Sequence, residues 1–113
     1  MVVGQPLESS STTGVNSTPN GEAPNAGAAY VFVRSGGTWS QQAYLKASNT
    51  GAGDQFGQSV AVSGDTVVVG ANGEDSSTSD INSTPNESAA SAGAAYVFVR
   101  SGSTWTEQAY LKP

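Results

Sequence analysis

The 113-residue chain contains no cysteine and no histidine, and these two absences exclude most of the common catalytic and metal-binding chemistry. Without them there is no disulfide framework, no thiolate or imidazole zinc site, no thiol nucleophile and no serine triad with a histidine base. A pair of carboxylates such as Asp54 and Asp65 could still run a glycosidase-type reaction. A carboxylate beside a turn more often accepts a local hydrogen bond, so we expect no enzymatic activity.

Basic residues are scarce as well. Four of them stand against nine acidic residues, which gives a net charge of -5. This charge repels phosphate backbones and anionic membrane surfaces, so nucleic acid is not an expected partner. No apolar run is long enough to span a membrane, and the residues after Met1 do not resemble a secretory signal. The chain begins inside an apparent strand, which suggests a designed product or a part of something longer.

The sequence is instead rich in internal repetition. Displacing the chain by 66 positions aligns residues 2 to 47 with residues 68 to 113 without a gap, and 31 of these 46 positions are identical. The identical stretches include GAAYVFVRSG, NSTPN and AYLK. A tandem repeat of this length predicts an array of similar structural units.

One complete unit, residues 48 to 113, predicts four short strands separated by turn-forming residues. The expected strands cover residues 59 to 62, 66 to 70, 94 to 100 and 104 to 111, and no helical periodicity is present. Residues 1 to 47 hold the last three strands only. We therefore predict an all-β fold of two tandem β-propeller blades made of four-stranded antiparallel sheets, in which the first blade lacks its innermost strand. A β-sandwich of two hairpin pairs is the alternative.

Several short motifs resemble the FG-GAP repeat, the blade unit of integrin α-subunit propellers and of bacterial surface proteins. The resemblance rests on Asp54-Gln55-Phe56-Gly57, on Val67 to Asn72 and on Gly93 to Phe98. It implies an extracellular or cell-surface protein. We expect structural roles for the motif residues, which are Phe56, Gly57, Gly70 and Ala71.

Many members of that family bind calcium in a loop between their first and second strands. Here this connection is reduced to Ser63-Gly64-Asp65-Thr66, which holds a single carboxylate, so the family's site does not carry over. Glu74, Asp75 and Asp80 form another acidic group that could bind a cation. Calcium through these three residues is the only cofactor that the sequence suggests.

The long polar loops, residues 5 to 26 and 71 to 92, offer other candidate sites. Their Asn-Ser-Thr-Pro-Asn copies either cover the edge of a sheet or contact a ligand. Asn16, Asn82 and Asn86 match the N-glycosylation pattern. Trp39 and Trp105 could stack on a sugar, although packing between sheets is the commoner use of such residues.

The missing strand predicts association. A two-blade chain cannot close a ring, so we expect a homo-oligomer or polymer built by head-to-tail packing, or further blades of a longer chain. A strand donated by a partner could also complete the first blade. The sequence thus favours a non-enzymatic structural, scaffold or adhesion module, and the alternative is a lectin-like module that binds carbohydrate or protein through its long loops.

Overall fold

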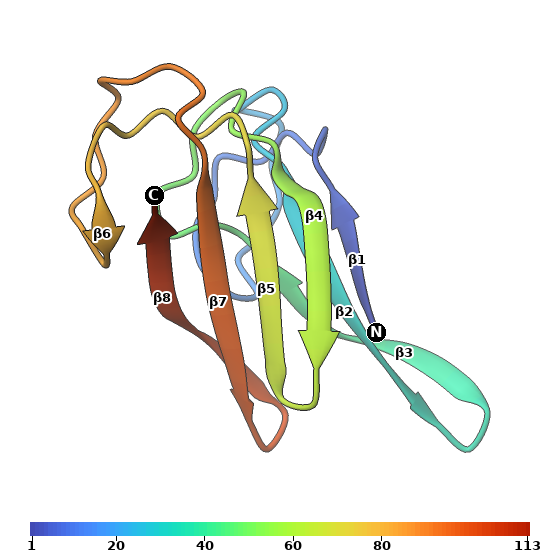
Figure 1. Cartoon of the computed structure of the whole chain (residues 1–113). Helices are drawn as coiled ribbons and strands as arrows, with labels where there is room; N and C mark the ends of the chain where they lie inside the picture. Colours follow the sequence, from blue (N-terminus) through green and yellow to red (C-terminus); the bar gives the residue numbers. More distant parts are fainter.

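The protein is an all-β molecule that contains no helix, as the sequence predicts. The computed structural model describes residues 1–113, which form eight strands in two antiparallel sheets. No helix of the kind that crosses a membrane is present. The two sheets lie one behind the other (Figure 1).

The first sheet contains three strands. They are β1 (Val2–Gln5), β2 (Ala28–Ser35) and β3 (Thr38–Leu45), in the order β1-β2-β3. Apolar β-branched and aromatic residues dominate β2, which favours a strand that is covered on both faces. Its outer end and the start of β3 form a hairpin that projects beyond the second sheet in Figure 1.

The second sheet contains five strands. Four of them are β4 (Phe56–Ser63), β5 (Thr66–Ala71), β7 (Ala94–Ser101) and β8 (Thr104–Lys112), which follow the expected strands, although β4 begins three residues earlier than predicted. The fifth is β6 (Asp80–Ile81), which pairs with β8 and gives the order β4-β5-β7-β8-β6. The prediction of a four-stranded sheet was therefore wrong by this one short strand.

Side chains alternate across a strand, so each sheet has an inner face, turned toward the other sheet, and an outer face, turned away. The inner face of the first sheet consists of Val2, Gly4, Ala29, Val31, Ala43 and Leu45. The inner face of the second sheet consists of Val67, Val69, Ala71, Tyr96, Phe98, Trp105 and Tyr110. Most of these residues belong to one buried cluster, so the hydrophobic core lies between the sheets.

The repeat relates inner faces to outer faces. A shift of 66 positions places the inner residues of the first sheet on the outer face of the second, at Val68, Gly70, Ala95, Val97, Ala109 and Leu111. The outer face of the first sheet likewise repeats the inner face of the second, at Met1, Val3, Gln5, Tyr30, Phe32, Trp39 and Tyr44. Each outer face therefore carries residues whose counterparts in the other repeat lie between the two sheets.

Both long loops return to the edge of their own sheet. In the first repeat, the backbone N–H of Asn16 donates to the carbonyl of Tyr44 at 2.7 Å, and the Asn16 side-chain oxygen accepts the Tyr44 N–H at 2.9 Å. Asn82 makes the same two bonds with Tyr110 at the same distances. The loops thus cover the free edges of β3 and β8, which would otherwise present unpaired backbone groups.

Candidate functional site

The second repeat contains a buried ion pair at the base of its long loop. The Lys112 ammonium lies 2.8 Å from a Glu74 carboxylate oxygen, and the side chains of both residues are 1% exposed. Lys112 also donates to the carbonyl of Gly93, while the hydroxyls of Ser76 and Tyr110 donate to Glu74. Burial alone would raise the pKa of Glu74, but these hydrogen bonds outweigh burial and lower it.

The first repeat contains the same arrangement. Lys46 lies 3.0 Å from Glu8 and donates to the carbonyl of Gly27 at 2.6 Å, and Ser10 donates to Glu8. The Glu8 side chain is 14% exposed, so this copy is less completely enclosed. Two copies that fix the loop to the last strand in the same way indicate a structural role for the pair.

These contacts determine where the predicted calcium ligands lie. Glu74 is already bonded to Lys112, Asp75 accepts the backbone N–H of Ser91 at 2.6 Å, and Asp80 lies exposed on β6. No group of three or more acidic side chains in the molecule could hold a metal ion. The structure therefore does not bring Glu74, Asp75 and Asp80 together as a cation site.

The candidate glycosylation residues lie on the loops. Asn16 and Asn82 are exposed, and their side-chain oxygens bind the backbone as described above. Asn86 is partly buried, and its side-chain oxygen accepts the backbone N–H groups of Ser77 and Ser88 at 3.0 Å each. All three side chains thus help to order the loops.

The segment before β4 brings the Phe-Gly motif between the two sheets. The Phe56 ring lies 5.2 Å from that of Tyr96 and 6.1 Å from that of Phe98, both in edge-to-face geometry. Gly57 has a φ of 94° and approaches the first sheet so closely that a Cβ atom would lie 2.3 Å from the Ala28 carbonyl oxygen. Only glycine fits this position, so the motif acts as a packing element.

The other two motif residues lie on β5. Ala71 is 1% exposed and packs in the core, whereas Gly70 lies on the outer face of the second sheet. This difference is notable because Gly4, the first-repeat counterpart of Gly70, lies on an inner face. The same residue type at the same strand position thus faces protein in one repeat and solvent in the other.

Comparison with known protein families identifies the chain. The family described as FG-GAP repeat matches residues 39–98, a range that includes the Phe-Gly motif and extends into β7. The chain belongs to the FG-GAP repeat family. No curated protein and no solved structure matches it.

Within this FG-GAP chain, the two candidate sugar-stacking tryptophans lie in different environments. Trp105 is 3% exposed, and its ring N–H donates to the side-chain oxygen of Gln42 across the sheets at 2.7 Å. Trp39 is 52% exposed on the projecting β2–β3 hairpin. The two residues do not form a common platform, and only Trp39 is available to a ligand or partner.

The two acids considered for catalysis also lie apart in the FG-GAP fold. Asp54 is buried before β4, and Asp65 follows β4, where it forms an ion pair with Arg100 on the surface. The eight residues of β4 separate them by about 26 Å. Glycosidase carboxylates lie roughly 5 to 10 Å apart, so this pair cannot flank one bond.

Asp54 is a buried carboxylate whose unusual environment the sequence did not indicate. It is 2% exposed, and one of its carboxylate oxygens has no hydrogen-bond partner. Burial, with the negative charges of Glu87 and Glu74, raises its pKa to about 7. The sequence shows its position beside the Phe-Gly motif. It does not show its burial, because that depends on the packing of the loop around residue 73.

Proposed function

We propose that this FG-GAP chain is a non-enzymatic structural module of an extracellular or surface scaffold. Its two sheets serve as neighbouring propeller blades, and its outer faces pack against further blades. FG-GAP repeats are typically extracellular, which supports this location. The partners are other copies of the chain, arranged head to tail in a ring or filament, or further blades of a longer protein.

One observation carries the proposal: the outer face of the first sheet repeats a face that is buried within the same chain. Val69 and Trp105 are 0% and 3% exposed between the sheets, whereas their counterparts Val3 and Trp39 are 43% and 52% exposed. Exposed apolar patches of this kind usually mark interaction surfaces. A second sheet packed on the first would bury them as the second repeat's residues are buried here.

The outer face of the second sheet supports the same interpretation over a β-sandwich. In a sandwich the outward residues of each strand are mainly polar. Here the outward residues of β7 and β8 include Val97, Val99, Ala109 and Leu111, all only partly buried. Apolar residues on both faces are expected of a blade that packs between two neighbours.

The internal interface also predicts the pairing between copies. Gln42 accepts a hydrogen bond from Trp105, and the counterparts of these residues are Gln108 and Trp39. In a head-to-tail contact, Trp39 of one copy would donate to Gln108 of its neighbour. β1 at the open edge of the first sheet could in addition accept a donated strand.

Measurement of mass in solution over a range of concentrations tests the proposal. We expect concentration-dependent association that is weakened about ten-fold or more by Trp39→Ala, because a buried tryptophan is a typical interface anchor. Leu7→Ala is the matched control, since Leu7 is 60% exposed in the loop that follows β1 and belongs to neither sheet. A chain that stays monomeric at high concentration, or association equally sensitive to both variants, would reject packing between copies.

The lectin-like alternative keeps one supporting observation, which is the exposure of Trp39. A glycan array with the unchanged chain and the Trp39→Ala variant separates the two functions. Specific glycan binding that disappears in the variant, without self-association, would favour carbohydrate recognition. Intact mass after expression in a glycosylating host tests Asn16, Asn82 and Asn86 as acceptors.

A further inference from the structure

The segment that precedes β4 is held by a row of carbonyl groups in the first repeat. The backbone N–H groups of Gly53, Gln55 and Phe56 donate to the carbonyls of residues 24, 25 and 26 at 2.9, 3.0 and 3.0 Å. Three successive loop carbonyls thus bind this irregular segment through its main chain, with φ values of 81° at Gly53 and 57° at Gln55. Main-chain hydrogen bonds of this kind do not select a sequence. Specificity must come from the surrounding contacts.

Two glycines of the first repeat leave the space into which the bound segment fits. A Cβ atom on Gly27 would lie 2.0 Å from the Phe56 carbonyl oxygen, and one on Gly4 would lie 2.0 Å from the Gly57 carbonyl oxygen. The bound segment in turn needs glycine at position 57, where a side chain would meet the Ala28 carbonyl. The first repeat therefore forms a receptor for a segment that carries Phe-Gly.

The second repeat has the same receptor without an occupant. Residues 90, 91 and 92 correspond to 24, 25 and 26, and none of their carbonyls accepts a hydrogen bond. The backbone is already in the same shape, because φ is 53° at Ser91 and 84° at Gly93, against 55° at Asn25 and 88° at Gly27. A Cβ on Gly93 would meet nothing closer than 3.8 Å.

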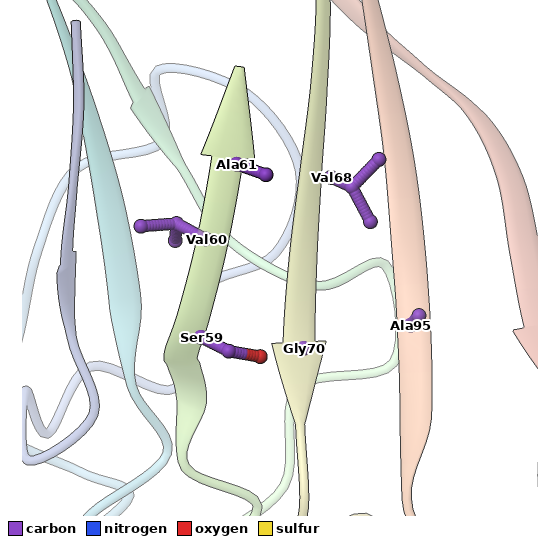
Figure 2. A pocket seen from close by; sticks show the side chains of 6 residues that line it. All are labelled: Ser59, Val60, Ala61, Val68, Gly70 and Ala95. Carbon is purple, nitrogen blue, oxygen red and sulfur yellow. The ribbon is translucent and has the colours of Figure 1, made fainter.

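Equivalent alanines are buried in the occupied receptor and more exposed in the empty one. Ala26 and Ala28 are 1% and 0% exposed under the bound segment, whereas Ala92 is exposed and Ala94 is only partly buried. Beside them the outer face of the second sheet has a hollow of about 170 Å³. Figure 2 shows its lining, with Ser59, Gly70 and Ala95 side by side on three strands.

We propose that the outer face of the second repeat is a binding site for an Asp-Gln-Phe-Gly segment supplied by another FG-GAP repeat. The segment donates its N–H groups to the carbonyls of residues 90 to 92. Its phenylalanine carbonyl lies over Gly93 and its glycine over Gly70. The inference deepens the proposed scaffold function, but it concerns the second sheet, whereas Trp39 lies on the first.

A synthetic peptide with the sequence of residues 50 to 62 is the direct probe. We expect it to shift the backbone NMR signals of residues 70 and 90 to 93 in the full-length chain, with an affinity weakened at least ten-fold by Phe→Ala or Gly→Val at the motif. Running the titration on the Trp39→Ala variant as well separates this site from self-association, since peptide binding should survive in that variant.

Gly70→Ala is the decisive change in the protein. At this position a Cβ would meet only the movable Ser59 hydroxyl, so the fold should be retained, yet it would block the incoming glycine carbonyl. We expect at least a ten-fold loss of peptide binding, with no loss for the control Gly21→Ala, where a Cβ meets nothing. Equal binding by the Gly70→Ala variant, absence of shifts at millimolar peptide, or shifts at β1 instead would overturn the proposal.

Discussion

The two repeats have nearly the same sequence, but the second contributes its aromatic face to the core, while on the first Trp39 is exposed and Tyr30 and Phe32 are only partly buried. Tyr30 and Tyr44 stack at 5.3 Å and 48°, and Tyr96 and Tyr110 stack with the same distance and angle. Local geometry is therefore fixed by the repeat sequence. The repeats differ in whether another sheet packs against the aromatic face. In a tandem array, the burial of a residue therefore depends on the neighbouring repeat as much as on the residue itself.

Replacing each tryptophan by alanine should produce the largest contrast. Trp105→Ala removes a buried ring and its bond to Gln42, which we expect to cost about 3–5 kcal/mol in the free energy of unfolding. Trp39→Ala should cost less than about 1 kcal/mol in dilute solution. Urea unfolding of the two variants measures both values, and equal losses would show that the repeats do not differ in packing as described.

The two buried ion pairs provide the next contrast. Glu74→Ala leaves the Lys112 ammonium buried and unpaired, so we expect a loss of about 3–4 kcal/mol. Glu8→Ala also leaves a buried ammonium, that of Lys46, but should cost less, about 2–3 kcal/mol, because Glu8 itself is more exposed and holds fewer hydrogen bonds.

The double replacement Glu74→Leu with Lys112→Met is the control for the ion-pair comparison. It removes both charges and should recover much of the lost stability. If the double variant were no more stable than Glu74→Ala, the unpaired charge would not be the cause of the loss.

Glycines at equivalent strand positions should differ by a smaller amount. Gly4→Ala forces a methyl group against the Gly57 carbonyl oxygen and should cost about 2–3 kcal/mol. Gly70→Ala should change stability by less than about 1 kcal/mol, since only the Ser59 hydroxyl must move. Thermal unfolding followed by circular dichroism compares them, and a larger loss for Gly70→Ala would contradict the assignment of inner and outer faces.

Asp54 lies in residues 48 to 66, which have no counterpart in the first repeat, and it adds a pH dependence of its own. The pKa of Asp54 is about 7 in the folded state and near 3.8 when unfolded, so the folded state binds more protons between these values. Stability should therefore fall as the pH rises, by about 2 kcal/mol between pH 5 and 7 from this group.

Asp54→Asn should remove this part of the pH dependence and leave the remainder. The measurement is the difference in unfolding free energy between the unchanged chain and the variant at each pH. Parallel curves would mean that Asp54 titrates normally. Glu74 and Glu8, whose pKa values are lowered, contribute mainly below pH 4.5 and with the opposite sign.

Much of the fold could be predicted because its signals are local. The turns at Ser63-Gly64-Asp65 and Ser101-Gly102-Ser103 and the apolar runs between them determine the hairpins, and both turn glycines have the positive φ that such turns need. The two-residue strand β6 was missed because Asp80 and Ile81 lie in a polar loop. They become a strand only by pairing with the edge of β8.

The candidate sites were harder to predict because they depend on distant partners. Glu74 resembled a calcium ligand within its loop, and its actual partner Lys112 lies 38 residues away. The repeat could have indicated this pairing, since Glu8 and Lys46 in the first repeat are separated by the same 38 residues. Trp39 and Trp105 have no such signal, because very similar surroundings in the sequence give opposite exposures.

The burial of both lysines has a practical consequence for chemical labelling. Lys46 and Lys112 are the only two lysines of the chain, and their side chains are 0% and 1% exposed. An amine-reactive reagent can therefore reach only the terminal amine while both loops stay closed. Attachment at either lysine would then report the opening of its own loop, so each repeat carries a separate built-in reporter of local unfolding.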